Sequence, residues 1–165
     1  MKTSRVLLGL VLTLAAGAWL RAEPVPATPA PSWKLKDLNG KFVSSDQFKG
    51  KVVVVDFWAT WCPPCRAEIP GYIELQNKYG KDGLVIIGVS CDQDKHAVQT
   101  VKSFAEKNHM NYQVVMADDD IQSAFGGMDA IPTTFIIDRS GQIRDRKVGA
   151  EPMAVYEQEI LKYLK

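Results

Sequence analysis

Residues 52–65 read VVVVDFWATWCPPC. The first half belongs to an apolar run, Lys51–Trp58, which follows Gly50 and contains four consecutive valines. Continuous β-branched and aromatic residues, without polar alternation, are typical of a central strand that is covered on both faces of a parallel sheet. This run therefore predicts a buried strand in an α/β domain.

Two cysteines separated by two residues follow this strand directly. Cys62 and Cys65 lie where the chain turns into an expected helix over Pro63–Tyr79. The sulfur of Cys62 would lie at the positive end of that helix, where free backbone N–H groups favour the thiolate form. We therefore expect Cys62 to be the nucleophile and the more buried Cys65 to be the resolving thiol. Pro63 and Pro64 lack N–H donors and stiffen the loop, so we expect them to tune the redox potential.

Hydrophobic periodicity and turn residues predict the other elements. Asn39-Gly40 indicates a hairpin near the start of the domain, because Asn-Gly suits a tight two-residue turn. Pro70 predicts a kink in the helix over Pro63–Tyr79. The expected strands are Trp33–Leu38, Lys41–Val43, Leu84–Ser90, Tyr112–Met116, Thr133–Asp138 and Gln142–Lys147, and the other expected helices are Lys95–Lys107, Ile121–Phe125 and Pro152–Leu164.

The order of these elements predicts the fold class. After an N-terminal β-hairpin, strands and helices alternate, and a final hairpin precedes the last helix. This is the order of an α/β domain with a mixed central sheet. A chain of 165 residues fits one such domain, which we expect to span residues 33–165.

The first 32 residues do not fit a folded domain. Met1–Ala22 has a positively charged start and then an apolar run, Val6–Leu20, which is too short for a hydrocarbon core about 30 Å thick. We interpret it as a secretory signal peptide, with an uncleaved membrane anchor as the alternative. Glu23–Ser32 holds four prolines and predicts an extended spacer or a plain disordered tail. Export would place the cysteines in an oxidising compartment.

Composition and charge exclude several classes of protein. The net charge is +1, and without Met1–Ala22 it becomes −2, because the remaining chain has 17 basic and 19 acidic residues. This balance excludes a strongly basic nucleic-acid binder. Three cysteines are too few for a disulfide-stapled miniprotein, and the odd one, Cys91, is set apart from the pair. We expect Cys91 to be a small buried or idle thiol, with a third redox thiol as the alternative.

Residues 55–65 resemble the active-site strand and loop of thioredoxins. Three further features match that family. They are Pro70, five residues after the second cysteine at the family's helix kink; Ile131-Pro132-Thr133, like the loop whose cis-proline packs beside the disulfide; and Val148-Gly149-Ala150, like the segment before the last helix. The resemblance covers about Lys51–Lys165 and implies a thioredoxin-like fold.

Departures from thioredoxin resemble a narrower group. The export segment, the Asn39-Gly40 hairpin, the central helix and strand over Lys95–Met116 and Glu68 are similar to the extracytoplasmic thiol–disulfide oxidoreductases of the TlpA/ResA type. This resemblance implies a reductant of protein disulfides in cytochrome c maturation or envelope thiol reduction, with a membrane thiol-transfer protein as electron donor. It implies no cofactor beyond the Cys62/Cys65 dithiol. We expect a monomer, tethered to the membrane if the N-terminal segment is retained.

The resemblance also assigns roles to two carboxylates. Glu68 matches a glutamate that influences cysteine ionisation in the TlpA/ResA group. Asp56 matches the buried aspartate of thioredoxins that assists proton transfer from the resolving thiol. We expect Asp56 or Glu68 to help deprotonate Cys65 after Cys62 has attacked a substrate disulfide.

The substrate is expected beside Pro132 and Trp61. Pro132, if cis, would present neighbouring backbone groups to an extended substrate strand. The choice of substrate depends on the surface around these two residues.

The residues alone also fit other functions. The pair could belong to a periplasmic oxidant or isomerase, which differs from a reductant only in redox potential. It could also belong to a non-catalytic thioredoxin-fold module that binds a partner, or form a structural disulfide. Haem attachment would need histidine in place of Arg66, and a peroxiredoxin-type site would need threonine in place of Ala59.

We predict no metal site. Zinc would need two further ligands from Cys91, His96 and His109, which lack the usual paired spacing. The acidic triplet at residues 118–120 is interpreted as a helix N-cap rather than a cation site.

Overall fold

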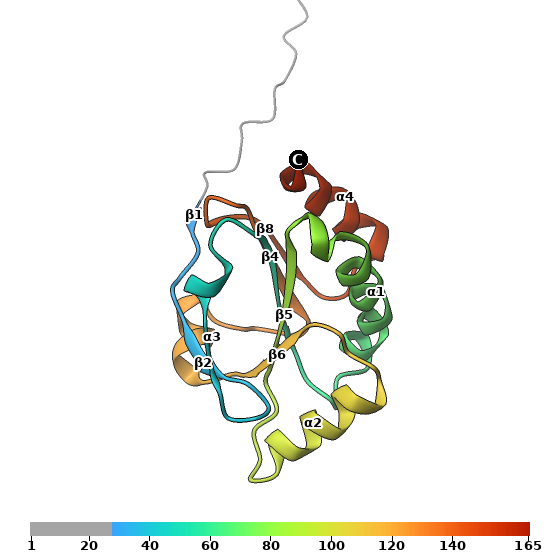
Figure 1. Ribbon diagram of the computed structural model, residues 1–165. Coiled ribbons are helices and arrows are strands. Elements are labelled where there is room, and N and C mark those ends of the chain that lie inside the picture. The colour runs from blue at the N-terminus through green and yellow to red at the C-terminus, as the bar shows by residue number, and fades with distance from the viewer. Residues whose placement is uncertain (1–27) are drawn as a thin grey trace, which may run out of the picture.

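The computed structural model describes residues 28–165 (Figure 1). In this part of the chain a six-stranded mixed sheet has the order β1-β8-β7-β4-β5-β6, and β2 and β3 form a separate ribbon. The strands are β1 Thr28–Pro29, β2 Lys34–Lys36, β3 Phe42–Ser44, β4 Val52–Trp58, β5 Leu84–Ser90, β6 Gln113–Met116, β7 Thr133–Ile137 and β8 Gln142–Val148. The helices are α1 Pro63–Tyr79, α2 Ala97–Lys107, α3 Asp119–Ala124 and α4 Met153–Leu164, with 3-10 turns at Ser45–Phe48 and Gly80–Asp82. The predicted α/β class is confirmed.

β4 lies at the centre of the sheet, as its apolar run predicts. It pairs in parallel with β5 and antiparallel with β7, and all seven of its residues are buried. Side chains alternate along a strand, so Val53, Val55 and Phe57 face one side of the sheet. Asp56 therefore lies on the opposite face, beneath α1.

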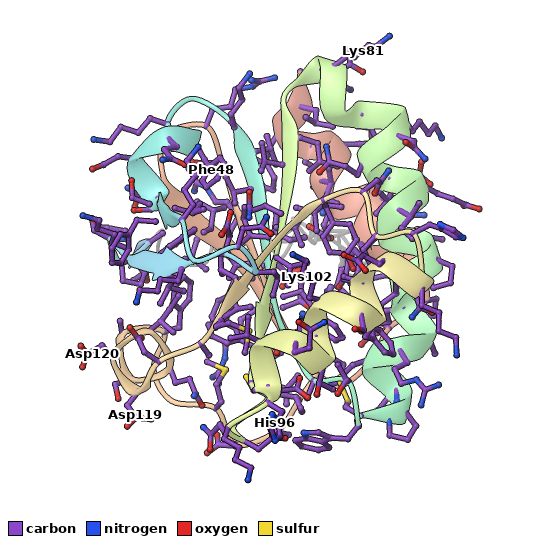
Figure 2. The ribbon with its side chains drawn as sticks, turned by 60° about the horizontal axis from the view of Figure 1, so that its bottom comes forward. Phe48, Lys81, His96, Lys102, Asp119 and Asp120 are labelled. Carbon is purple, nitrogen blue, oxygen red and sulfur yellow. A yellow bond between two sulfur atoms is a disulfide. The ribbon has the colours of Figure 1, made fainter. Side chains whose placement is uncertain are left out.

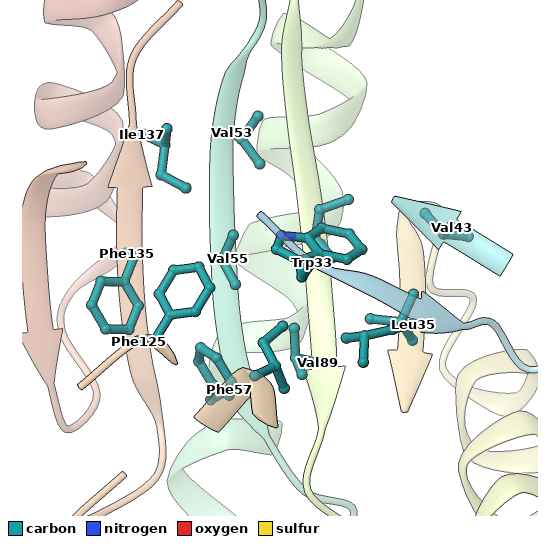
Figure 3. Packing of buried hydrophobic residues seen from close by; sticks show 13 residues of the cluster. Trp33, Leu35, Val43, Val53, Val55, Phe57, Val89, Phe125, Phe135 and Ile137 are labelled. Carbon is teal, nitrogen blue, oxygen red and sulfur yellow. The ribbon is translucent and has the colours of Figure 1, made fainter. Parts of the chain in front are cut away.

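α1 and α4 cover one face of the sheet, and the β2–β3 ribbon and α3 cover the other (Figure 1). On the helical face, α1 and α4 contribute large buried side chains, namely Tyr72, Leu75, Tyr156 and Ile160. On the ribbon face, Trp33 lies over β5 and Leu35 beside β6, and a group of aromatic rings that includes Phe57, Phe125 and Phe135 packs over the neighbouring strands (Figure 3). Burial on both faces holds the end of β4 in a fixed position, and the cysteines follow that end.

The folded part of the chain begins earlier than expected. Thr28 and Pro29 lie in the stretch interpreted as a spacer, but they form an edge strand that pairs with β8. An edge strand tolerates proline because one row of its backbone groups needs no partner within the sheet. The sheet therefore includes residues before Trp33, from Thr28 onward in the described chain. The predicted signal peptide or anchor at residues 1–22 and the first part of the spacer lie outside the described residues.

From Thr28 to Lys165, no helix is both long enough and apolar enough to cross a membrane.

Local sequence signals explain the bounds of two helices. α1 begins at Pro63 and ends at Tyr79 as predicted, and it continues through Pro70. The Asp118 carboxylate accepts a hydrogen bond from the Ile121 N–H at 2.8 Å, which confirms the N-cap interpretation of the acidic triplet.

Candidate functional site

Cys62 and Cys65 form a disulfide at the N-terminus of α1. Cys62 is the N-cap residue, and its Sγ accepts a hydrogen bond from the Cys65 N–H at 3.3 Å. Pro63 and Pro64 occupy the first two helical positions, so two of the four N–H groups that an α-helix usually leaves free are missing here. The N-terminus of α1 therefore offers the Cys62 sulfur fewer donors than most helices would.

The disulfide is almost covered by protein. The exposed fractions are 3% for Cys62 and 1% for Cys65, so the expected difference in burial is small in the disulfide state. Both sulfurs belong to a cluster with Trp58 and Ile69, and Val101 from α2 packs into the same cluster. The inserted helix α2 thus closes the end of the sheet on which the disulfide lies.

The loop before β7 lies against the disulfide, as predicted. The Ile131–Pro132 peptide bond is cis, and the Ile131 carbonyl oxygen lies 3.8 Å from Cys62 Sγ. The Pro132 carbonyl accepts a hydrogen bond from the Gly149 N–H at 2.8 Å, which ties this loop to the end of β8. The end of β8 therefore helps to hold the Pro132 loop beside Cys62.

Trp61 projects from the same surface. Its side chain is 66% exposed, although it comes directly before a buried cysteine. A large exposed aromatic ring beside a reactive pair offers an apolar contact for a partner. Trp61 is thus an exposed apolar side chain directly next to the disulfide.

Asp56 is buried beneath α1 with an exposed fraction of 3%. Its Oδ1 accepts a hydrogen bond from the Thr134 hydroxyl at 3.1 Å. Burial and the negative charge of Glu68 raise the pKa of Asp56 to about 8, and the bond from Thr134 opposes this rise. Such a carboxyl changes its protonation state in the pH range in which thiols ionise.

Glu68 is the second buried carboxyl, with an exposed fraction of 4%. It lies one helical turn after Cys65, on the same face of α1. Its Oε1 accepts a hydrogen bond from the Glu151 N–H at 3.1 Å, whereas Oε2 has no hydrogen-bond partner within residues 28–165. Burial raises the pKa of Glu68, and the Glu151 N–H partly offsets this effect. The structure thus brings together both carboxyls that the sequence singles out.

A group of buried hydroxyls lies around Asp56, and no motif in the sequence marks it. The Thr134 hydroxyl lies 3.1 Å from the Tyr72 hydroxyl and 3.5 Å from the Tyr156 hydroxyl. Burial raises the pKa of both tyrosines, so they stay neutral donors. The only sequence signal for this group is a threonine within the apolar run of β7, because its partners come from two separate helices.

Asp92 is a further site residue that the sequence does not reveal. It is buried, and it accepts hydrogen bonds from the Thr60 N–H at 3.0 Å and from the Thr60 hydroxyl at 2.5 Å. Ser90 donates a third hydrogen bond at 2.8 Å. These bonds fix the loop that leads into Cys62 to the end of β5.

Cys91 lies near this site but does not join it. Its N–H donates to the Trp58 carbonyl at 2.8 Å, which places it beside the end of β4, while its side chain packs against the core on the ribbon face. Cys91 is a free, partly buried thiol. Burial and the charges of Asp56 and Asp92 raise the pKa of Cys91 to about 11, which disfavours the reactive thiolate.

We expect Cys91 to be unreactive and dispensable for disulfide exchange. A thiol with so high a pKa and partial burial should react with a maleimide far more slowly than the reduced Cys62/Cys65 pair. Cys91→Ser should reduce disulfides at the wild-type rate, measured by insulin turbidity. A large loss of rate in this variant, with an unchanged melting temperature, would restore the interpretation of Cys91 as a third redox thiol.

The surface residues with metal-binding side chains lie in separate parts of the fold. His96, Asp119 and Asp120 project from the surface at the ends of two different helices (Figure 2). Within the part of the chain that the structure describes, no group of three or more histidine, cysteine, aspartate or glutamate side chains could hold a metal ion.

Comparison with known proteins agrees with this geometry. The model of the AhpC/TSA family matches residues 26–146. The chain belongs to the AhpC/TSA family. It is 34% identical to the thioredoxin-like protein YneN of Bacillus subtilis, over 79% of this chain and 76% of YneN. It is 32% identical to the thiol-disulfide oxidoreductase ResA of Bacillus anthracis, over 89% of this chain and 87% of ResA.

Solved structures support the same assignment. A thiol:disulfide interchange protein of the thioredoxin family from Chlorobium tepidum superimposes with a TM-score of 0.77 at 35% identity, over 86% of this chain and 99% of that protein. The thioredoxin-like fold and the resemblance to the ResA group are therefore confirmed. This member of the AhpC/TSA family is a thiol–disulfide oxidoreductase with a Cys62–Cys65 disulfide.

Proposed function

We propose that the protein works outside the cytoplasm as a reductant of protein disulfides. The observation that supports a reductant is the environment of the disulfide. Few backbone N–H groups can donate to the Cys62 sulfur, and two buried carboxyls lie beneath the same helix. Pro63 and Pro64 remove two N–H groups from the start of α1, and Asp56 and Glu68 lie beneath it.

The free energy of the reduced state connects these surroundings to redox direction. A strongly stabilised thiolate favours the reduced form and makes the protein an oxidant. Missing N–H donors destabilise a thiolate instead, as does negative charge on a neighbouring carboxyl. The disulfide form is then favoured, so the reduced protein passes its electrons to a substrate readily.

The reaction proceeds in two exchanges. The Cys62 thiolate attacks one sulfur of a substrate disulfide, forms a mixed disulfide and releases the other substrate sulfur as a thiolate. Cys65 then loses its proton to Asp56 and attacks Cys62 Sγ. The Cys62–Cys65 bond forms, the bond to the substrate breaks and the second substrate sulfur leaves as a thiolate, so two electrons pass to the substrate.

Docking of the substrate rests on the exposed surface of the site. Trp61 supplies an apolar contact, and the backbone beside Pro132 can pair with an extended segment. A substrate disulfide in a strand or loop would thereby approach Cys62 from the open side, away from α1.

The proposed setting follows from the N-terminal sequence and from the ResA resemblance. A leader at residues 1–22 would deliver the domain to the extracytoplasmic side, where it is retained if the leader is not cleaved. Each turnover leaves Cys62 and Cys65 joined as a disulfide, and a membrane thiol-transfer protein then returns two electrons to the pair. Reduction of disulfides during cytochrome c maturation or of other envelope proteins is the corresponding role, carried out by a monomer with no cofactor beyond its dithiol.

The redox potential tests the direction of this proposal. We expect equilibration of the full chain with glutathione buffers to give a potential far below that of a strong periplasmic oxidant, which is about −120 mV. The fraction of reduced protein is measured by mass spectrometry after alkylation, with Cys91→Ser as a control that removes the third thiol. A potential near that of the oxidant would show that the protein forms disulfides and would overturn the proposed direction.

A further inference from the structure

Thr134 lies directly opposite Asp56 in the antiparallel pair of β4 and β7. Its exposed fraction is 1%, and its hydroxyl donates to Asp56 Oδ1 at 3.1 Å. The Thr134 hydroxyl oxygen also lies within 3.5 Å of the hydroxyls of Tyr72 on α1 and Tyr156 on α4. One hydroxyl thus joins the buried carboxyl to side chains from two helices.

A threonine hydroxyl can serve both protonation states of a carboxyl. It carries one hydrogen to donate and two lone pairs to accept. When Asp56 is ionised, the Thr134 hydroxyl donates to it, and a tyrosine donates to Thr134. When Asp56 is protonated, its own O–H can donate to Thr134, whose hydrogen then turns toward Tyr72 or Tyr156.

We propose that Thr134 is a positioning residue for the resolving step, and that its hydroxyl reverses its hydrogen bond as Asp56 takes the proton of Cys65. This inference rests on the proposed role of Asp56 as the base. Cys65 attacks only as a thiolate, so the proton must leave its sulfur before the mixed disulfide can be resolved. Thr134 keeps a hydrogen-bond partner on Asp56 before and after that transfer.

The hydrogen bond from Thr134 is the main contact that favours the ionised form of Asp56. The titratable groups on its side of the sheet are Glu68 and Tyr72 from α1, Tyr156 from α4 and Tyr112 before β6. Cys91 after β5 interacts with Asp56 through charge, although its side chain lies on the ribbon face. All of these are acids, so none of them stabilises a negative charge as a cation would. Burial and Glu68 raise the pKa of Asp56, whereas the Thr134 hydroxyl lowers it. Loss of the hydroxyl would leave a carboxylate that is harder to form.

The Thr134→Val variant removes the hydroxyl and keeps the branched shape, and Thr134→Ser keeps the hydroxyl. Both are made in full-length Cys91→Ser protein, together with Asp56→Asn and the Asp56→Asn/Thr134→Val double variant. The reduced proteins are mixed with an aromatic disulfide that releases a coloured thiolate. Stopped-flow absorbance then shows two releases, first from the attack of Cys62 and second from the attack of Cys65, between about pH 5 and about pH 10.

We expect Thr134→Val to move the pH profile of the second release upward by about one unit and to slow that release about tenfold at neutral pH, because a hydrogen bond to a charged group is lost. The first release should stay unchanged, which provides an internal control. Thr134→Ser should restore the wild-type profile. In the Asp56→Asn background the valine substitution should have no further effect.

Two outcomes separate this inference from the role of Asp56. If Asp56→Asn changes the second release but Thr134→Val does not, Asp56 is the base and Thr134 does not position it. If Asp56→Asn leaves the second release and its pH profile unchanged, the proposed base itself is wrong. Equal slowing of both releases by Thr134→Val, or an undiminished effect in the Asp56→Asn background, would assign Thr134 to packing alone and overturn the inference.

Discussion

Cys62→Ser is expected to reduce disulfide exchange to the background rate. Cys62 is the sulfur that lies against the Ile131 carbonyl, beside the Pro132 loop, so we expect its thiolate to be the group that attacks. A serine hydroxyl is a far weaker nucleophile at neutral pH and forms no mixed disulfide. Insulin reduction with dithiothreitol as the electron donor measures this loss, and Cys91→Ser is the matched control. Equal rates for wild type and Cys62→Ser would contradict the assignment of Cys62 as the nucleophile.

Cys65→Ser is expected to stop the same reaction one step later. The variant keeps the attacking sulfur but cannot resolve the mixed disulfide, so substrates stay attached through Cys62. The full chain expressed in a bacterial host should therefore capture partners that are released by reductant and identified by mass spectrometry. Partners confined to the cytoplasmic fraction would contradict the proposed extracytoplasmic role. The Cys62→Ser/Cys65→Ser double variant is the control for non-specific binding.

Asp56→Asn is expected to stabilise the fold at alkaline pH. The pKa of Asp56 is about 8 in the folded protein, against about 3.9 for an unperturbed aspartate. Between these values the unfolded chain is ionised and the folded protein is protonated, so wild-type stability falls as the pH rises toward 8. Asparagine is neutral throughout, and it should exceed the wild type by a few kcal/mol at alkaline pH and match it at low pH.

Denaturant unfolding of the oxidised proteins at acidic, neutral and alkaline pH measures this difference. Asp119→Asn, at the exposed start of α3, controls for the change in net charge. A constant difference between wild type and Asp56→Asn at every pH would show that Asp56 does not titrate as described. Combined with slower exchange, a stabilised Asp56→Asn variant would show a carboxyl that lowers stability and raises activity.

The sequence predicted most of the fold because its strongest signals are local. Four valines in succession indicated the central strand, and the first proline after Cys62 marked the start of α1. The pairing of Thr28 and Pro29 with β8 was missed, because two residues in a proline-rich stretch carry no periodicity. The β7–β8 hairpin places β8 next to Thr28 and Pro29 only once the sheet has formed, so the pairing of β1 with β8 is visible in the structure and not in the sequence.

The site was predicted in part for a similar reason. The cysteines and the two carboxyls stand out in the sequence as a close pair and as charges in apolar or helical surroundings. Thr134 and Asp92 do not, because their roles depend on register and on loops that meet only in space. Asp56 and Thr134 become neighbours when β4 and β7 align, and no spacing along the chain encodes that alignment.

The edge strand β1 also sets how far from the disulfide the described part of the chain begins. Thr28 lies beside Ile143, near the start of β8, whereas Pro132 and the disulfide lie near Val148 at its far end. Five residues of extended chain separate these points, or roughly 16 Å. The described chain therefore enters the sheet at the end of β8 that lies away from the disulfide, which leaves the approach to Trp61 and Pro132 free of β1.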